Sequence, residues 1–275
     1  MIGAEPPELL RQAATPGEVA LLVKNLDLPT DDPFGTSLEH INLQVRAGEI
    51  VGIAGVSGNG QGALMAALSG EDRRSPRGSI TLFGKDVSRM GPAHRRRLGL
   101  NSVHEERLGR GAVPTLSLAQ NTLLTRDNAI GPGGWLRVQG VKAMAQNLIE
   151  RYKVKAGGPQ ALAKSLSGGN LQKFIMGREI DARPEVLLVS QPTWGVDVGA
   201  AAQIRGELLA LRDAGCAVLL VSEELNELFE ISDRLMVISQ GRLSPSIPTA
   251  DATVEQIGAW MSGLWADAEA EHVQA

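Results

Sequence analysis

Apolar residues occur along the chain in two patterns, continuous short runs and runs that alternate with polar residues. The continuous runs are EIVGIA, EVLLVSQ and AVLLVSEE, at residues 49–54, 185–191 and 217–224. Such runs are typical of strands covered on both faces, as in a parallel sheet. The segment LEHINLQV, residues 38–45, alternates instead, which predicts a strand with one exposed face. Further strands are predicted at residues 19–28, 78–87 and 234–243.

Segments in which apolar residues have helical spacing lie between or after these predicted strands. Such spacing occurs in ALMAALSG, IRGELLALRDAG and VEQIGAWMSGLW, residues 63–70, 204–215 and 254–265, and Gly215 is placed as a stop signal. Residues from about 107 to 170 are expected to be helical and loop-rich, with amphipathic segments at 119–124 and 141–154 and a Gly/Pro stretch at 129–135. Strands that alternate with helices predict an α/β fold with a parallel or mixed sheet.

Composition excludes several classes of partner. The 275 residues are 43% hydrophobic and 21% charged, as in ordinary soluble globular proteins. Aromatic residues make up 3% and the net charge is −4, so we expect no nucleic-acid partner. The one dense basic run, HRRR at residues 94–97, is expected on a solvated helix face. Cys216, the only cysteine, is predicted to be buried, and no stretch reaches the roughly 18 apolar residues that span a bilayer.

A glycine-rich loop, GVSGNGQGAL at residues 55–64, lies between a predicted strand and a predicted helix. Gly55, Gly58 and Gly60 follow the spacing G-x-x-G-x-G, which lets backbone N–H groups and the positive end of the helix dipole face a phosphate. A phosphate loop continues with lysine and then serine or threonine. Gln61 and Gly62 hold those two places here.

Two alternatives fit the same glycines. One is a structural tight turn without a ligand. The other is a dinucleotide loop, because residues 58–63 match G-x-G-x-x-[GA]. That loop needs an acidic residue about 20 positions further on, and Asp86 lies 28 residues past Gly58, which is a poor fit.

A second motif, LSGGNLQK at residues 166–173, resembles the LSGGQ signature of ATP-binding cassette (ABC) domains. Segments similar to other motifs of that family appear in the same order along the chain: HEERLGRG at 104–111, EVLLVSQPT at 185–193, GVDVGA at 195–200 and VSEEL at 221–225. The resemblance covers about residues 19–245. It implies a P-loop NTPase (RecA-like) α/β fold, with a mixed sheet, an antiparallel β subdomain and a helical signature subdomain.

The resemblance also implies a division of the chain. Residues 1–18 would be a linker or the tail of a preceding cassette. Residues 19–250 would form the nucleotide-binding domain, with its helical subdomain at about 107–170. Residues 251–275 would form a C-terminal helix and tail.

Each motif position receives an expected role from the resemblance. ATP is expected to lie on Gly55, Ser57, Gly58, Asn59, Gly60, Gln61 and Gly62, with Phe34 stacked on adenine; simple loop packing is the alternative for Phe34. Glu105 takes the place of the glutamine-loop glutamine, and Asp197 is the D-loop aspartate. Ser190 stands where an aspartate helps hold Mg²⁺, Gln191 where a glutamate polarises water, and Glu223 where a histidine is usual.

These replacements remove the groups that phosphoryl transfer uses. The lysine charge, the metal ligands and the proton acceptor all stabilise or prepare the transition state, and a neutral amide at Gln61 or Gln191 replaces neither charge. The predicted site therefore holds ATP with weak or no Mg²⁺ and is a weak or inactive ATPase.

The signature segment is expected to act on another cassette. ABC domains close head to tail, so Ser167, Gly168, Gly169 and Asn170 would face the γ-phosphate bound by the partner. Their hydroxyl and N–H groups lie at a predicted helix start, which favours anions. A helix N-cap followed by packing glycines is the alternative reading of the same residues.

Three segments resemble the second cassette of tandem-cassette importers for nucleosides or sugars. They are GVxGNGQ, SQPTxGVDVGA and VSEEL. That similarity implies three partners: a second cassette in the same full-length chain, transmembrane permease subunits docked near residues 105–121, and indirectly a substrate-binding lipoprotein. The expected location is the cytoplasmic face of a bacterial membrane, held there peripherally. Residues 1–3, MIG, echo residues 261–263, MSG, as the tail of a preceding cassette would. A stand-alone chain, a fully active ABC ATPase and a non-transport ABC scaffold stay open.

Overall fold

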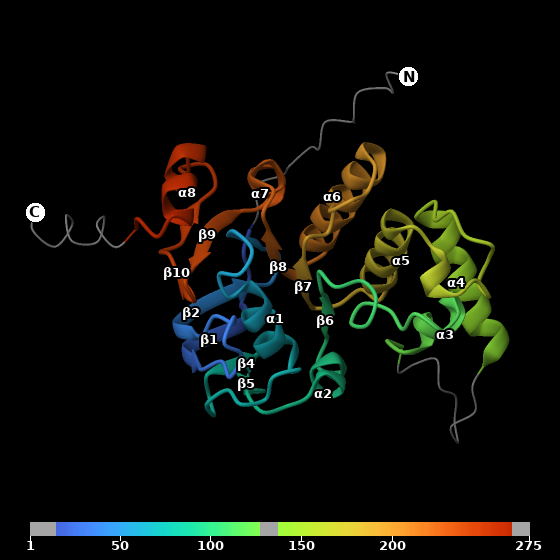
Figure 1. The fold of residues 1–275 in the computed structure, drawn as a ribbon, viewed down its shortest axis with the longest axis horizontal. Helices are drawn as coiled ribbons and strands as arrows, with labels where there is room; N and C mark the ends of the chain where they lie inside the picture. Colours follow the sequence, from blue (N-terminus) through green and yellow to red (C-terminus); the bar gives the residue numbers. More distant parts are fainter. Residues whose placement is uncertain (1–14, 127–136, 266–275) are drawn as a thin grey trace, which may run out of the picture. The chain divides into compact units, whose positions relative to one another are not determined.

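The computed structural model describes residues 15–126 and 137–265 (Figure 1). The echo at residues 1–3 and the whole Gly/Pro stretch at 129–135 lie outside the described residues. The described chain forms two compact units. The core unit comprises residues 15–102, 185–191 and 209–265, and the helical unit comprises 103–126, 137–184 and 192–208.

A mixed sheet forms the centre of the core unit (Figure 1). In sheet order, its strands are β10 (Arg242–Leu243), β9 (Arg234–Ser239), β3 (Ile50–Ala54), β8 (Ala217–Ser222), β7 (Val186–Ser190) and β6 (Leu100–Val103), and β11 (Ile247–Pro248) pairs with β9. β3 pairs in parallel with β8 and β9, and β7 with β8, whereas β10 and β11 are antiparallel to β9. Every residue of β3, β7 and β8 is buried, so the prediction from continuous apolar runs is confirmed.

A second, antiparallel sheet belongs to the same unit. Its order is β2 (Leu38–Arg46), β1 (Val19–Leu28), β4 (Ile80–Leu82) and β5 (Lys85–Asp86). Burial alternates along β2 from residue 41 to 45, as predicted for a strand with one exposed face. His40 interrupts the alternation with a φ of 51°, and the pairing register shifts between Leu26 and Leu28 of β1. A local irregularity of this kind changes the direction in which side chains near the end of a strand point.

The helices of the core unit are α1 (Gln61–Ser69), α2 (Pro92–Arg97), α7 (Leu225–Ile231) and α8 (Val254–Met261). One hydrophobic cluster joins α1 to inward residues of β1, β2, β3, β4 and β8. The last helix is shorter than predicted. It ends at Met261 because Gly263 takes a left-handed φ of 84° and its N–H returns to the carbonyl of Trp260, a glycine-dependent helix stop.

The basic run at residues 94–97 corrects another expectation. Arg95 is fully buried instead of solvated. Its guanidinium donates to the carbonyl oxygens of Ala67 and Leu68, both at 2.6 Å, and of Met90 at 3.0 Å. The last carbonyls of a helix have no partner within the helix, so Arg95 satisfies the end of α1. Burial lowers the pKa of Arg95 to about 10, which leaves it charged at neutral pH.

The helical unit is built from α3 (Leu118–Leu123), α4 (Val138–Arg151), α5 (Gly168–Asp181), the 3₁₀ turn Ala163–Ser165 and the start of α6 (Val198–Asp213), whose last residues belong to the core unit. Ala119, Val141 and Ala145 form a small apolar cluster between α3 and α4. Ser117 begins α3 with a capping box that includes Gln120, a motif that satisfies two backbone donors. No helix in the described ranges has the length and apolar character needed to cross a bilayer.

Candidate functional site

The glycine-rich loop connects β3 to α1 in the core unit, as predicted. Gly60 is the N-cap of α1 with a left-handed φ of 106°, which other residues rarely adopt. A β-carbon on Gly55 would lie 2.8 Å from the carbonyl oxygen of Ile238, so the loop start also needs glycine. The loop therefore has the strand, turn and helix start of a phosphate cradle.

Gln61, in the place of the lysine, turns its side chain back into this loop. Its Nε2 donates to the carbonyl oxygen of Val56 at 2.7 Å, and its Oε1 accepts from the backbone N–H of Asn59 at 3.0 Å. The Asn59 side chain adds a bond to the Val56 carbonyl at 2.9 Å and accepts from the N–H of Gln240 at 2.8 Å. The amide oxygen of Gln61 thus accepts from the Asn59 N–H, a loop donor that a bound phosphate would otherwise use.

The residues at the expected metal positions offer few of the oxygen ligands that Mg²⁺ uses. Gly62 has no side chain, and a β-carbon added there would meet nothing within 4 Å. Ser190, at the end of β7, is buried and offers one hydroxyl. Mg²⁺ in nucleotide sites is held by carboxylate, hydroxyl and phosphate oxygens in octahedral geometry. Within the described residues no group of three or more His, Cys, Asp and Glu could hold a metal ion.

Phe34 lies on a loop of the core unit beside the phosphate loop. Its side chain is 97% exposed, so the loop-packing alternative is wrong. Its backbone N–H is held by the carboxylate of Asp32 at 3.0 Å, and the Thr36 hydroxyl donates to the carbonyl oxygen of Gly58 at 2.6 Å. This tether keeps an unpacked aromatic ring near the loop, where it is available for stacking on a base.

Gln191 follows β7 with a left-handed φ of 51°. Its N–H donates to the carbonyl of Val221 at 2.9 Å, and its Oε1 accepts from the N–H of Glu223 at 3.3 Å. The amide therefore fastens the end of β7 to the segment after β8. The Glu223 side chain is exposed.

A carboxylate that sequence reasoning missed lies close by. Glu227 of α7 is buried, and the Ser222 hydroxyl donates to its Oε2 at 2.8 Å. The same Ser222 hydroxyl lies 3.5 Å from the Gln191 amide oxygen. Glu227 thus helps to fix the end of β8. In the sequence, Glu227 lies one helical turn after VSEE. That spacing alone does not distinguish a buried site residue from a surface residue.

The signature segment opens α5 in the helical unit. Ser167 is the N-cap residue, but its hydroxyl does not cap the backbone; it accepts from Asn170 Nδ2 at 2.8 Å. Asn170 Oδ1 in turn accepts from the N–H of Lys155 at 2.8 Å. Ser167 thus holds the N-cap position that the alternative reading gives it, but without the side-chain bond of a cap. The first N–H groups of a helix have no intrahelical acceptor, so the donors at Gly168 and Gly169 keep the capacity to bind an anion.

Asp197 begins α6 in the same unit. Its Oδ1 accepts from the N–H of Ala200 at 2.9 Å, and its Oδ2 lies 3.5 Å from the ammonium of Lys173. The Ala200 N–H, followed by the Lys173 charge, lowers the pKa of Asp197. The D-loop carboxylate is thus ionised at neutral pH and joins the start of α6 to the signature helix.

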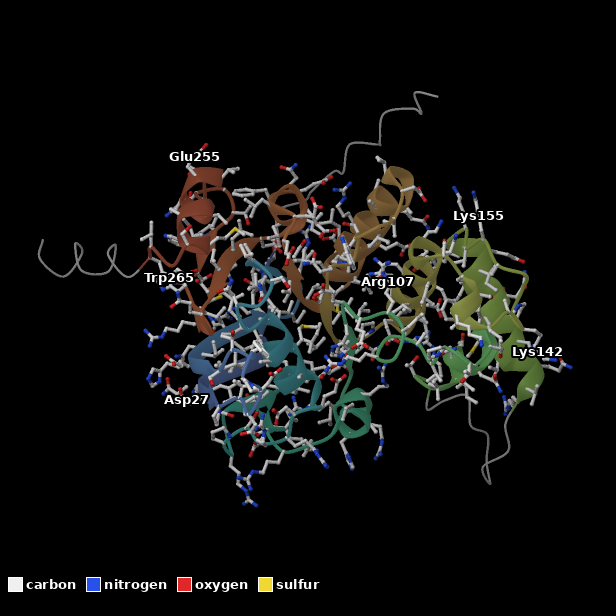
Figure 2. The ribbon with its side chains drawn as sticks, viewed as in Figure 1. Asp27, Arg107, Lys142, Lys155, Glu255 and Trp265 are labelled. Carbon is white, nitrogen blue, oxygen red and sulfur yellow. The ribbon has the colours of Figure 1, made fainter. Side chains whose placement is uncertain are left out.

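Arg107, labelled in Figure 2, is another residue that the sequence analysis missed. It lies in the segment 104–111, two positions after the exposed Glu105, and contacts the Trp194 loop and Gln172 of α5. The signal was the triplet EER, where only the first residue matched a motif position.

The predicted site residues thus fall into two groups. The loop residues at 55–62, Phe34, Ser190, Gln191 and Glu223 belong to the core unit, and Glu105, the signature residues at 167–170 and Asp197 belong to the helical unit. Each group has contacts within its own unit. Their roles toward a nucleotide stay predictions.

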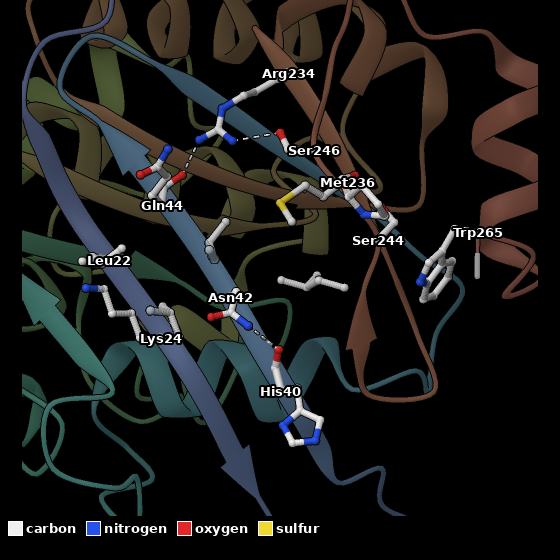
Figure 3. A pocket seen from close by; sticks show the side chains of 14 residues that line it. Leu22, Lys24, His40, Asn42, Gln44, Arg234, Met236, Ser244, Ser246 and Trp265 are labelled. Carbon is white, nitrogen blue, oxygen red and sulfur yellow. Dashed lines mark hydrogen bonds between the residues drawn. The ribbon is translucent and has the colours of Figure 1, made fainter. Parts of the chain in front are cut away.

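A groove of about 540 Å³ also lies in the core unit, lined by residues of β1, β2 and β9 and by Trp265 (Figure 3). Arg234 at its edge is bound to the Ser246 hydroxyl at 2.8 Å and to the carbonyl oxygen of Gln44. None of residues 55–62 lines this groove. It is therefore separate from the predicted nucleotide loop.

Comparison with known proteins gives a consistent result. Residues 38–194 match the family model described as ABC transporter. The chain is 38% identical over 255 residues to the guanosine import ATP-binding protein NupO of Bacillus subtilis, covering 92% of this chain and 50% of that protein. It is 38% identical to the glucose import ATP-binding protein TsgD13 of Haloferax volcanii, covering 92% of this chain and 46% of that protein. The chain spans about half the length of these relatives.

Solved structures agree on the fold. An ATP-binding subunit of an ABC transporter superposes with a TM-score of 0.71 at 17% identity, over 88% of this chain and 99% of that one. A dimeric ATP-binding cassette bound to ADP and Pi gives 0.70 at 18% identity, over 83% and 98%. The predicted P-loop fold, with its mixed sheet and antiparallel sheet, is confirmed, and the dinucleotide alternative is wrong. With more than half of the chain matched by the family model, this protein belongs to the ATP-binding proteins of ABC transporters.

Proposed function

We propose that this chain is the second, catalytically impaired cassette of a tandem-cassette importer for nucleosides or sugars. Its own phosphate loop holds ATP weakly or without turnover. Its signature segment completes the ATP site of the first cassette. Transmembrane permease subunits bind near residues 105–121, a substrate-binding lipoprotein delivers the cargo, and the protein works peripherally at the cytoplasmic face of a bacterial membrane.

The relatives support the transport class. Their names describe import ATP-binding proteins for guanosine, nucleosides, glucose and ribose. The chain matches about half of each, which is the proportion that one cassette of a tandem pair would have. Nothing in this chain selects among those cargoes, since the permease and the lipoprotein make that choice in an importer.

The single observation that best supports impaired hydrolysis at this site is the position of the Gln61 side chain. Its amide is bonded to Val56 and Asn59 within the loop, where a lysine would supply a positive charge to the phosphates. The metal positions Gly62 and Ser190 and the base position Gln191 add no carboxylate. Loss of one group that stabilises the transition state costs roughly two to three powers of ten in rate, and here several are replaced together.

ATP itself has a place in this arrangement. The loop N–H groups and the start of α1 would bind phosphates once the Gln61 amide moves aside, and Phe34 would stack on adenine. ATP bound here would supply phosphate charge at the surface where the partner cassette is proposed to meet this one. The residues of this chain then bind and orient it without activating water.

Hydrolysis by the purified chain tests the impaired site. We expect MgATP turnover far below the range of about 1–1,000 s⁻¹ that is typical of enzymes. The variant Gln191→Glu restores a carboxylate, and its combination with Gln61→Lys, Gly62→Ser and Ser190→Asp restores the other groups. Ordinary turnover by the unmodified chain, unchanged by Gln191→Glu, would contradict the proposal and favour the fully active alternative.

The role in trans needs the full-length protein assembled with its permease. Ser167→Ala removes the hydroxyl offered to the partner's γ-phosphate and should lower ATP turnover in the assembly about tenfold or more. Ser165→Ala, two residues earlier, is the matched control, because its hydroxyl is bonded to the carbonyl of Leu162. Equal turnover in both variants would refute the trans role, and failure to copurify a permease would favour the non-transport scaffold.

A further inference from the structure

The guanidinium of Arg107 joins three motif segments of the helical unit. Its Nε donates to Oε1 of Gln172 at 3.0 Å, and a terminal nitrogen donates to the carbonyl oxygen of Trp194. The guanidinium carbon also lies 5.0 Å from the centre of the Trp194 ring, which is a cation–π distance. One side chain from segment 104–111 therefore contacts both the signature helix and the loop before Asp197.

The start of α5 is packed against the same guanidinium. A β-carbon on Gly168 would lie 2.6 Å from a terminal nitrogen of Arg107, and one on Gly169 would lie 2.7 Å from the carbonyl oxygen of Gly195. The approach at Gly169 is to backbone and requires glycine, whereas a side chain at position 168 would have to displace the end of Arg107. The two signature glycines thus rest on Arg107 and on the loop that Arg107 holds.

Gln172, on α5, connects Arg107 to the loop that contains Pro192. It is buried, and its Nε2 donates to the carbonyl oxygen of Pro192 at 3.0 Å while its Oε1 accepts from Arg107. The Gln172 amide therefore binds the loop at one end and the guanidinium at the other. Because a guanidinium carries its donors in a rigid plane, it can donate to two acceptors while it stacks on a ring, whereas an ammonium has no planar face to stack.

We infer that Arg107 is a positioning residue for the signature segment: it sets Ser167, Gly168 and Gly169 against the Trp194–Asp197 loop in the geometry that the partner's ATP requires. The inference rests on the proposed trans role. It further makes Arg107 the link between the segment proposed to meet the permease and the segment proposed to meet the partner's nucleotide. Arg107 itself touches neither ligand.

The main test measures ATP turnover by the full-length protein assembled with its permease. Arg107→Ala should lower kcat roughly 10- to 100-fold, the effect of small misplacement of groups at a reacting centre, with KM for ATP changed much less. Ethylguanidinium in the buffer should restore part of the loss, whereas Arg107→Lys should resemble Arg107→Ala. Lys142→Ala removes an exposed positive charge from α4 of the same unit and should leave turnover unchanged.

A second measurement separates this inference from the trans role. Amide hydrogen exchange on the purified chain should become faster at residues 167–171 and 194–197 in Arg107→Ala, and stay unchanged in Lys142→Ala. If Ser167→Ala lowers turnover but Arg107→Ala or Arg107→Lys keeps the wild-type rate, the inference is wrong and the trans role stands. If Ser167→Ala has no effect, the trans role is wrong, and unchanged exchange in Arg107→Ala would then also overturn the positioning role.

Discussion

The side-chain amide of Gln61 donates a 2.7 Å hydrogen bond to the carbonyl oxygen of Val56, within the loop that Gln61 itself follows. The same amide accepts from Asn59. The loop is therefore closed by its own residue, and a phosphate must compete with an intramolecular bond. A neutral intramolecular hydrogen bond is worth about 0.5–1.5 kcal/mol net, so we expect this competition to weaken nucleotide binding without abolishing it.

Restoring the cation and the hydroxyl should strengthen binding of MgATP. Gln61→Lys with Gly62→Ser adds a charged donor, and Gly62 has open space for the new side chain. Hydrogen bonds to charged groups are worth about 1.5–3 kcal/mol, so Kd for MgATP should fall about 10- to 100-fold, and more with Mg²⁺ than with EDTA. Calorimetric titration measures both. Gln61→Met opens the loop without adding charge and is the control; equal tightening in both variants would assign the gain to loop opening alone.

Loss of the buried guanidinium of Arg95 should destabilise the core unit. Arg95→Met leaves the carbonyl oxygens of Ala67 and Leu68 without their donor. Buried acceptors left unpaired cost about 1–3 kcal/mol each, so the free energy of unfolding should fall by about 2–6 kcal/mol. Urea denaturation measures it. Arg97→Met, on the exposed side of the same helix, should change it by about 1 kcal/mol or less; similar losses for both variants would contradict the role of Arg95.

The cap that Asp197 provides should depend on pH in a defined direction. Asp197→Ala should lower stability at pH 7 by about 1 kcal/mol, while Asp197→Asn keeps an oxygen for the Ala200 N–H. The pKa of Asp197 is lowered in the folded protein, so its ionic contribution is complete above the unfolded value of about 3.9. It disappears as pH falls through the lower folded value.

The wild type and Asp197→Asn should therefore differ in stability by a constant amount from about pH 5 to 7 and converge below about pH 4. Thermal unfolding followed by circular dichroism across this range measures the difference. A gap that widens on acidification would show that the carboxylate is stabilised less by folding than its Ala200 and Lys173 contacts indicate.

Cys216 should be unreactive in the folded protein. It is buried, as the sequence predicted, and burial raises the pKa of its thiol to about 12. At pH 8 the thiolate population should be about a thousandfold below that of an exposed cysteine with a pKa of about 8.5. Titration with a disulfide reagent should label it only after unfolding in guanidinium chloride. Stoichiometric labelling of the native protein within minutes would mean that the start of β8 opens readily.

Local pattern was enough to predict most of the architecture. Within the apolar runs at 49–54, 185–191 and 217–224, residues 50–54, 186–190 and 217–222 form fully buried strands, because a strand covered on both faces needs apolar residues at successive positions. The glycine loop and the signature start were likewise found where the motifs put them, since Gly60 and Ser167 act through backbone geometry beside a helix. The exact end of α8 was missed, because Gly263 decided it over the apolar spacing that continues to Trp265.

Contacts between distant residues were decided only by the tertiary structure. Sequence identified Gln61 as uncharged, but not that its amide returns to Val56. It placed Arg95 on a solvated face, although the carbonyls that Arg95 binds come from a helix 27 residues away. It passed over Arg107, whose partner Gln172 is 65 residues distant along the chain. The sequence by itself determined which groups the site has and lacks; the fold decided which of them meet, because a hydrogen bond depends on distance in space and carries no local periodicity.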